Sequence, residues 1–288
     1  MNKDVYCDVK IAVHLHLYYT QQLDEMLRLL HNLRGYAVDL FVTVNEMRPE
    51  IEQKIINFQK NAVIWQVENR GYDVGPFVDF LHRINLEKYD YVLKIHTKRR
   101  IYGQFCYLNK HRFNMATWRK MLLSALLSKS VVNDNIRRLE DNPKIGMLGS
   151  VWCLTHDEAD YRQLLSELTT QIDKIGLKVP QNKDFIAGTM FLVRAQLLKP
   201  FLFYQIGDFA ATDGKCHDGT LAHLLERLFG WAITAQGYEV CGVADAKYFG
   251  ARFWAGLCRF VWQKKRTRNG KTLIKICKIP VYHGGKNA

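Results

Sequence analysis

The sequence predicts an α/β fold in which a Rossmann-type, mainly parallel sheet is flanked by helices and followed by a basic, aromatic C-terminal appendage. Strand-like apolar runs alternate along the chain with segments whose apolar residues recur every three or four positions. This alternation is typical of parallel strands joined by helical crossovers. Because no internal repeat or low-complexity linker interrupts it, we expect one main domain and a tail.

The first half of the chain shows the clearest alternation. Residues 8–18 alternate and then become apolar, which suits a buried strand with His14 and His16 near its end. Residues 21–33 carry apolar side chains at helical spacing and stop at Gly35. The other elements expected here are a strand at 38–44, a helix at 49–60, a strand at 62–67, a helix at 77–84 and a strand at 89–95.

The second half is richer in helical patterns. A strand interrupted by small residues is expected at 185–194. Asp218 precedes a helix at 219–229, where the helix dipole favours a carboxylate. The other elements expected here are helices at 118–127, 131–140, 164–175 and 197–203 and a strand at 145–152.

The composition points to a folded protein with an anionic partner. Among 288 residues, 48% are hydrophobic and 12% aromatic, which excludes a disordered chain. The 41 basic and 28 acidic side chains give a formal net charge of +13. Nucleic acid, an acidic membrane surface and a phosphorylated small substrate would all suit that charge.

Cysteine usage indicates a reducing compartment. The seven cysteines are scattered and form no Cys-x-x-Cys pair, which argues against a zinc site and a disulfide framework. The N-terminus lacks a signal-peptide pattern, and no stretch approaches the roughly 18–20 apolar residues that span a bilayer. We therefore expect a cytoplasmic protein, with peripheral contact to the inner face of the membrane left open.

Polar residues follow the third strand, at the turn into the next helix. Asn69 and Arg70 suit hydrogen bonds to sugar or phosphate oxygens, and Gly71 and Gly75 flank Asp73 and permit close approach of the backbone to a ligand. The alternative is an ordinary turn with a capping Asp. The dinucleotide fingerprint of three spaced glycines is absent.

A cationic cluster follows the next strand, which we expect to be a neighbour in the sheet. In single-sheet nucleotide-sugar enzymes such a strand usually ends in Asp-x-Asp, which holds a divalent metal. Here the place reads His96-Thr97-Lys98, so we expect no divalent metal and no other cofactor. Lys94, Lys98 or Arg99 would instead neutralise a leaving diphosphate directly. The alternative is a charge run facing solvent.

The combined order of motifs resembles the rhamnan synthesis protein F family of glycosyltransferases. The matching segments are 11–16, 68–77, 91–98, 187–191 and 218–223. The resemblance implies a GT-A-like fold and a cytoplasmic enzyme that builds a bacterial surface polysaccharide of the O-antigen or rhamnan type. It implies a dTDP- or UDP-linked donor of rhamnose or another hexose such as galactose, and a lipid-linked glycan acceptor.

Transfer with inversion requires a general base for the acceptor hydroxyl. We predict Asp218 for this role, with His217 as the second candidate; the alternative is that Asp218 only caps its helix. Asp184, Gly188 and Thr189 are predicted to form the acceptor wall, against the alternative of a strand bulge.

His14 and His16 alternate on one strand and so share a face. We predict that they contact the donor nucleotide. The alternative is that they are satisfied core histidines.

The predicted division is a glycosyltransferase domain at 1–243 and an appendage at 244–288. The appendage mixes aromatic and basic residues, which suits either contact with an anionic membrane surface or a helix docked on the main domain. Two other function classes fit the charge: a nucleic-acid-binding module, although no reader motif is present, and a membrane-bound scaffold without activity.

Overall fold

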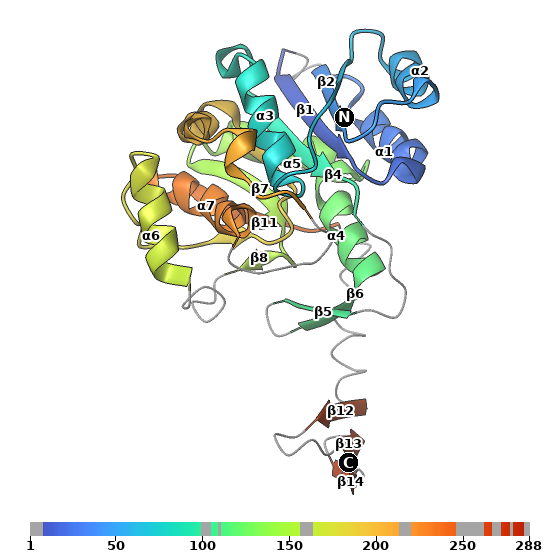
Figure 1. Ribbon diagram of the computed structural model, residues 1–288, viewed down its shortest axis with the longest axis vertical. Helices are drawn as coiled ribbons and strands as arrows, with labels where there is room; N and C mark the ends of the chain where they lie inside the picture. Colours follow the sequence, from blue (N-terminus) through green and yellow to red (C-terminus); the bar gives the residue numbers. More distant parts are fainter. Residues whose placement is uncertain are drawn as a thin grey trace.

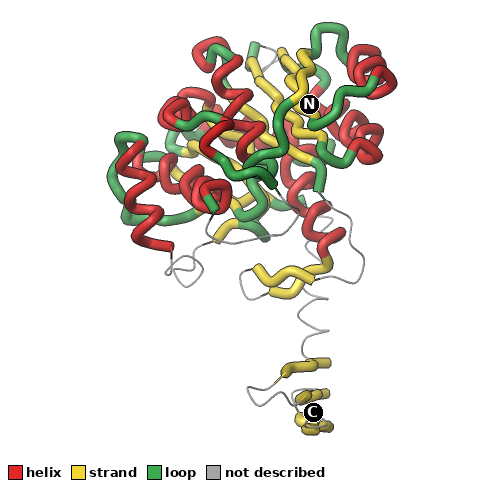
Figure 2. Tube along the Cα trace, viewed as in Figure 1, coloured by secondary structure: helices red, strands yellow, loops and turns green. Residues whose placement is uncertain are grey.

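The computed structural model describes residues 8–98, 105–108, 111–155, 164–212, 220–245, 262–266, 272–276 and 279–284. The predicted architecture is confirmed, because a mainly parallel central sheet is flanked by helices (Figure 1, Figure 2). The order of its seven strands is β11 (Glu239–Val243), β7 (Ile145–Ser150), β10 (Phe191–Arg194), β4 (Tyr91–His96), β1 (Lys10–Leu17), β2 (Ala37–Val44) and β3 (Val63–Gln66). β10 runs antiparallel to β4 and β7, whereas the other neighbours pair in parallel.

The helices follow the predicted order. They are α1 (Leu23–Leu30), α2 (Pro49–Phe58), α3 (Val74–Arg83), α4 (Met115–Leu127), α5 (Val132–Asp141), α6 (Leu165–Lys174) and α7 (Leu221–Ala235). Short 3-10 helices are η1 (Thr20–Gln22), η2 (His31–Leu33), η3 (Leu86–Lys88), η6 (Ala195–Phe203) and η7 (Ile206–Asp208). α2 shows the sequence logic plainly: Pro49 occupies its first turn together with Glu50 and Glu52, which complement the helix dipole.

The two faces of β1 pack against different helices. The His14 ring stacks on Phe80 of α3 with centroids 4.8 Å apart, and α3 in turn contacts α7 through Phe77 and Phe229. Since successive strand residues point to opposite faces, the fully buried Val13 and Leu15 face the other way. The sheet is therefore buried on both sides, as its continuous apolar strands predict.

Residues 185–194 differ from the single strand predicted there. They form β9 (Phe185–Ile186), which pairs with β8 (Leu154–Thr155), and then β10 in the central sheet. Gly188 and Thr189 separate the two strands, with φ angles of +92° and +51° in the left-handed region. A continuous strand cannot accommodate that conformation, so the small residues mark a switch between sheets.

Several short strands have no sequence-based prediction. β5 (Phe105–Leu108) pairs with β6 (His111–Asn114), and β12 (Trp262–Arg266), β13 (Thr272–Ile276) and β14 (Ile279–Gly284) form a separate antiparallel sheet. Most of the aromatic stretch for which a docked helix was considered, residues 246–261, lies outside the described residues. No helix in the described ranges combines the length and apolar character that crossing a bilayer requires.

Candidate functional site

The carboxyl ends of β1 and β4 bring ionisable side chains together. These strands pair in parallel, with His14 opposite Lys94 and His16 opposite His96. β10 approaches β4 from the other direction, with Phe191 opposite Lys94, so the residues before Phe191 reach the same edge. Ligands of open α/β sheets bind outside the carboxyl ends of the strands.

The two polar clusters meet at this edge by a route that differs from the prediction. The strands that precede them, β3 and β4, are not neighbours, since β1 and β2 lie between them. The turn after β3 instead leads into α3, and Asp73, which precedes the first residue of that helix, pairs with Lys94 of β4.

A buried ion pair forms the centre of the cluster. Lys94 Nζ lies 2.5 Å from Asp73 Oδ2 and donates a second hydrogen bond to the Thr189 carbonyl oxygen at 2.9 Å. The Thr189 hydroxyl donates to the same Asp73 oxygen. The side chain of Lys94 is 1% exposed and that of Asp73 is 18% exposed. Each buried charge is thus paired, as its desolvation requires.

Lys94 therefore does not have the position expected from the sequence. We expected its ammonium group to neutralise a leaving diphosphate directly, but this group is enclosed and faces Asp73. Burial lowers the pKa of Lys94, and the Asp73 carboxylate opposes that shift. Burial also raises the pKa of Asp73, but His96, Lys94 and Lys98 together hold it below its ordinary value. Asp73 is accordingly a carboxylate at neutral pH.

His14 and His16 share one partner, the Thr43 hydroxyl on β2. His14 Nε2 and His16 Nδ1 each lie 3.0 Å from Thr43 Oγ1. A hydroxyl donates one proton, so one imidazole accepts from Thr43 and the other donates to it. Burial lowers the pKa of both histidines, that of His16 to about 3. His14 is fully buried and stacks on Phe80 as a core residue would, but its Nδ1 has no hydrogen-bond partner among the described residues.

His96 links β4 to the segment before β10. Its Nδ1 lies 3.1 Å from the Thr97 carbonyl oxygen and its Nε2 lies 3.0 Å from the Gly188 carbonyl oxygen. Burial lowers the pKa of His96 to about 4, against the opposing effect of Asp73. The imidazole is therefore neutral at pH 7 and adds no charge to the edge.

The turn after β3 is fastened to a segment about 140 residues later in the chain. The Asn69 carbonyl oxygen accepts from Thr212 N, and Gly71 N donates to the Ala210 carbonyl oxygen. Arg70 donates through Nη1 to the Phe209 carbonyl oxygen at 2.9 Å and pairs with Glu68 at 2.6 Å. These bonds fix the turn, and they already occupy part of the Arg70 guanidinium that was predicted to bind the donor.

Gly71 and Gly75 permit close packing inside the protein. A Cβ atom on Gly71 would lie 2.5 Å from Phe209 Cδ1, and one on Gly75 would lie 2.2 Å from the Arg70 carbonyl oxygen. Packing against Phe209 and Arg70 thus accounts for both glycines, and their predicted contact with a ligand stays a prediction.

Two non-glycine residues of the described chain have positive φ angles, and both contact or adjoin Asp73. Tyr72 precedes it with φ 55°, and Thr189 donates to it with φ 51°. Such backbone strain persists only where the surrounding structure enforces it, and it concentrates at functional sites. This coincidence marks the Asp73 cluster as the leading site candidate.

Lys98 follows β4 and lies beside α4. Its Nζ is 4.0 Å from the centre of the Trp118 ring, a cation–π arrangement. Gly188 packs against the same helix, since a Cβ there would lie 2.9 Å from Leu122 Cδ1 and 3.1 Å from Trp118 Cζ2. The space expected at Gly188 for a sugar ring is thus filled by α4.

The predicted acceptor residues do not form one wall. Gly188 N donates to Glu226 Oε1 of α7 at 2.6 Å, and Thr189 belongs to the buried cluster. The Asp184 carbonyl oxygen approaches Gly230. Gly230 lies about one helical turn after Glu226 on α7. Asp184 and Thr189 therefore occupy separate places.

His217 and Asp218, the predicted base candidates, lie outside the described residues. Tyr72 contacts the described residues on both sides of them. Its N donates to Thr212 Oγ1 at 3.3 Å, and its ring packs edge-on against His223 with centroids 5.5 Å apart.

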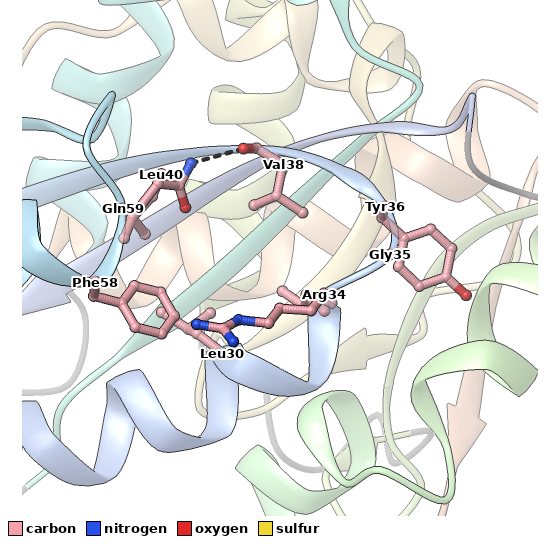
Figure 3. Close-up of a pocket in the computed structure, with 9 residues that line it drawn as sticks. Leu30, Arg34, Gly35, Tyr36, Val38, Leu40, Phe58 and Gln59 are labelled. Atoms are coloured by element: carbon pink, nitrogen blue, oxygen red, sulfur yellow. Dashed lines mark hydrogen bonds between the residues drawn. The ribbon is translucent and has the colours of Figure 1, made fainter. Parts of the chain in front are cut away.

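A hollow of about 260 Å³ lies away from this edge, at the start of β2 (Figure 3). It is lined by Leu30, Leu33, Arg34, Gly35, Tyr36, Val38, Leu40, Phe58 and Gln59. Gln59 Nε2 donates to the Val38 carbonyl oxygen across its margin. None of these residues was predicted to act, and none belongs to the Asp73 cluster.

The described side chains do not fit a divalent metal. Within the described ranges, no three His, Cys, Asp or Glu side chains are grouped so as to hold a metal ion. The Asp73 oxygen that faces the edge is already engaged by Lys94 and Thr189.

Residues 1–238 match the family described as rhamnan synthesis protein F. The chain belongs to this family. A protein named WxcX from Xanthomonas campestris pv. campestris strain B100 is 30% identical over 244 residues, and its counterpart in strain ATCC 33913 is equally similar. Each alignment covers 82% of this chain, which spans about a third (33%) of the length of these curated relatives.

Solved structures to which the chain is similar include several glycosyltransferases. A mannosyltransferase, PcManGT from Pyrobaculum calidifontis, in complex with GDP-Man and Mn²⁺, has a TM-score of 0.41 at 12% identity over 85% of this chain and 59% of its own. The galactosyltransferase LgtC has a TM-score of 0.41 at 10% identity over 81% and 73%. Glucosyl-3-phosphoglycerate synthase from Mycobacterium tuberculosis, solved with Mn²⁺ and UDP, has a TM-score of 0.35 at 13% identity over 96% and 90%.

The family agrees with the enzyme class predicted from the sequence. The prediction that no divalent metal takes part is contradicted, because PcManGT and the glucosyl-3-phosphoglycerate synthase were solved with Mn²⁺. The absence of Asp-x-Asp after β4 was too narrow a basis for that prediction.

Sequence reasoning missed three contributors to the site. Thr43 gave no signal, because a Thr inside an apolar strand is common. Phe209 follows the short 3-10 helix η7, far along the chain from the turn it supports, and Glu226 of α7 accepts a hydrogen bond from Gly188 N. A carboxylate, Glu226, within a mostly apolar helix was the available signal.

Proposed function

We propose that this chain is a glycosyltransferase domain that transfers a hexosyl group from a nucleotide diphosphate donor to a growing bacterial surface polysaccharide. One observation carries the proposal: in a member of this family, the strained turn after β3 and the end of β4 converge on the Asp73 cluster. Such an edge is where open α/β sheets bind nucleotides.

The donor is proposed to be dTDP- or UDP-linked rhamnose or a related hexose such as galactose. Among the described residues of the edge, the cations that are not fully buried are Arg70 and Lys98, and we assign them to the diphosphate. His16, neutral at pH 7, serves as a hydrogen-bonding group beside it, whereas both ring nitrogens of His96 face protein carbonyl oxygens. Asp73 and Lys94 attach the turn after β3 to β4. They contribute by positioning the groups that contact the donor.

Transfer is proposed to proceed with inversion. Asp218, or His217 beside it, removes the proton of an acceptor hydroxyl, whose oxygen then bonds to the anomeric carbon. The bond from that carbon to the diphosphate breaks on the opposite side, and the diphosphate leaves with the electron pair. Comparison of the anomeric configuration in donor and product tests the inversion, and retention would contradict it.

The acceptor is proposed to be a lipid-linked glycan. We also propose that residues 244–288 form a separate appendage that contacts an anionic membrane surface. Ile279 and Val281 of β14 are 65% and 54% exposed, and β12 carries Lys264, Lys265 and Arg266 in sequence. Apolar and cationic groups together favour an anionic bilayer.

Calorimetric titration of the purified protein with UDP and dTDP, each with and without Mn²⁺, tests the donor site. We expect micromolar binding of one of them, with at least tenfold weaker binding in Lys98→Met. Absence of binding by both nucleotides under every condition would overturn the proposal. Co-sedimentation with phosphatidylglycerol vesicles, and its loss in Ile279→Asp, tests the appendage separately.

A further inference from the structure

Gln22 has a buried side chain that connects α4 to Lys98, two residues after the end of β4. Its Nε2 atom donates to the Lys98 carbonyl oxygen at 2.8 Å. Its Oε1 atom accepts from Arg119 Nε at 2.9 Å and from Lys98 N at 3.4 Å. Gln22 is 3% exposed and Arg119 is 1% exposed, so these bonds form away from water.

The Gln22 amide has one orientation because Arg119 imposes it. A guanidinium has only donors, so the atom facing Arg119 must be the Gln22 oxygen, and the amide nitrogen must face the Lys98 carbonyl. Arg119 is itself fixed by Glu25 of α1, which accepts from Nη1 at 3.0 Å and from Nη2 at 2.5 Å. Such a two-bond contact defines direction as well as distance.

Both the main chain and the ammonium group of Lys98 are consequently held in place. Gln22 fixes its main chain, and the neighbouring residue of Arg119 on α4, Trp118, lies against its ammonium group at 4.0 Å from the ring centre. Lys98 is also close enough to Asp73 to lower the pKa of that carboxyl. The network therefore places a cation at the edge where the turn after β3 arrives.

A purely structural role would be to tie α1 to α4. Apolar residues could do this as well, because replacing a buried ionic network by a packed apolar one is often neutral or stabilising. The polar chain from Glu25 through Arg119 and Gln22 instead terminates on both main-chain groups of Lys98. The network thus fixes one backbone position after β4, that of Lys98. A contact that only holds α1 and α4 together would not need to do so.

We infer that Gln22 is a positioning residue for the donor diphosphate: it sets Lys98 at the end of β4, and Arg119 and Glu25 fix the Gln22 amide. This inference rests on the proposed function, in which Lys98 contacts the diphosphate. Gln22 touches no substrate itself, so its effect must pass through Lys98 and must disappear when the Lys98 cation is removed.

The experiment is a double-mutant cycle on ligand binding by the full chain. Gln22→Met keeps the length of the side chain and removes its hydrogen bonds, and Lys98→Met removes the cation. UDP and dTDP are the probes, with uridine and thymidine as ligands without phosphate. We expect Gln22→Met to weaken diphosphate binding about tenfold, equivalent to about 1.4 kcal/mol, to leave nucleoside binding unchanged, and to add nothing in the Lys98→Met background.

Gln59→Met is the matched control. Gln59 makes the same kind of bond, from its Nε2 to the Val38 carbonyl oxygen at 2.7 Å, but at the distant hollow. It should leave the binding of UDP and dTDP unchanged. Gln22→Glu is a second variant that keeps an oxygen facing Arg119 and removes the N–H donor to Lys98; it should weaken diphosphate binding as Gln22→Met does.

The outcomes separate this inference from the proposed function. If Lys98→Met weakens diphosphate binding but the Gln22 variants do not, or if the two losses add independently, the positioning role is wrong. If Lys98→Met binds UDP and dTDP as the parent does, the proposed diphosphate contact fails first. Equal losses for nucleosides and diphosphates in Gln22→Met would indicate general damage to the fold and would also overturn the inference.

Discussion

The ammonium group of Lys94 and the carboxylate of Asp73 form a 2.5 Å ion pair beneath the sheet edge. Asp73 belongs to the turn before α3, and Lys94 lies on the central strand β4. Thr189 contacts both partners, so one cluster joins the turn, the strand and the segment before β10. The site is thus organised around an internal pair of opposite charges.

Asp73→Asn should destabilise the protein by about 3–5 kcal/mol at pH 7, because it leaves the buried Lys94 cation without a counter-ion. Urea unfolding followed by circular dichroism measures this loss. Asp24→Asn is the control, since Asp24 pairs with Lys54 on the surface with side chains 77% and 54% exposed, and it should cost less than about 1 kcal/mol. Similar losses for both variants would contradict the buried pair.

Stability should fall as the pH is lowered from about 6.5 to about 4. Burial holds the pKa of His16 at about 3 and that of His96 at about 4. The unfolded chain binds protons below about pH 6.5 and the folded chain does not, so the free energy of unfolding drops by on the order of 1 kcal/mol per pH unit for each histidine. The Asp73 pKa is lowered, so its contribution is lost only below about pH 4.

Unfolding midpoints in urea at several pH values between 4 and 8 measure this slope. His96→Gln should make it shallower, because one buried imidazole is removed while an N–H donor to the Gly188 carbonyl can remain. His31→Gln, at an exposed position on η2, should leave the slope unchanged. A pH-independent midpoint across this range would show that the histidines titrate normally.

Gly71→Ala should cost more stability than Gly176→Ala. Both glycines have left-handed φ angles, +65° and +75°, so each substitution carries a backbone cost of about 1–2 kcal/mol. Only the Cβ on Gly71 meets a neighbour, Phe209 Cδ1 at 2.5 Å, which adds about 1–3 kcal/mol of overpacking. Thermal unfolding compares the two, and Phe209→Leu should recover part of the Gly71→Ala loss. Equal losses would mean that the turn moves freely away from Phe209.

Thr189→Val should lower stability by about 1–3 kcal/mol, because it removes a hydrogen bond to a buried carboxylate while keeping the shape of the side chain. The backbone cost of the φ angle of 51° is shared by both β-branched residues. Thr189→Ser retains the hydroxyl donor to Asp73 and serves as the control. Denaturant unfolding with unchanged slopes should separate the two variants; a stable Thr189→Val would show that Lys94 alone satisfies Asp73.

The sequence was sufficient to predict those helices and strands whose pattern depends on neighbouring residues. The alternation of β1 and the helical spacing of α1 depend on neighbouring residues, and both elements were predicted close to their observed bounds. β10 and β11 were harder. β10 is four residues long and follows a left-handed Thr189, and its antiparallel insertion between β4 and β7 depends on partners about 45 and 100 residues away.

The site was predicted in outline and not in its electrostatics. The turn at 69–75 and the end of β4 could be recognised because polar residues followed apolar strands. Whether Lys94 faces solvent or a counter-ion depends on where α3 places Asp73, which no local pattern reveals. The same holds for Gln22, whose role is visible only once α4 brings Arg119 beside it.

The antiparallel insertion of β10 also sets an order of events during synthesis. β4 ends at His96, but the strand that covers its free edge begins at Phe191. At about 5–20 residues per second, the ribosome needs roughly 5–20 s to make the intervening chain. An apolar strand with an open edge can pair with other chains during that interval. The nascent protein is thus most exposed to aggregation, and most in need of a chaperone, before Thr189 emerges to reach Asp73 and Lys94.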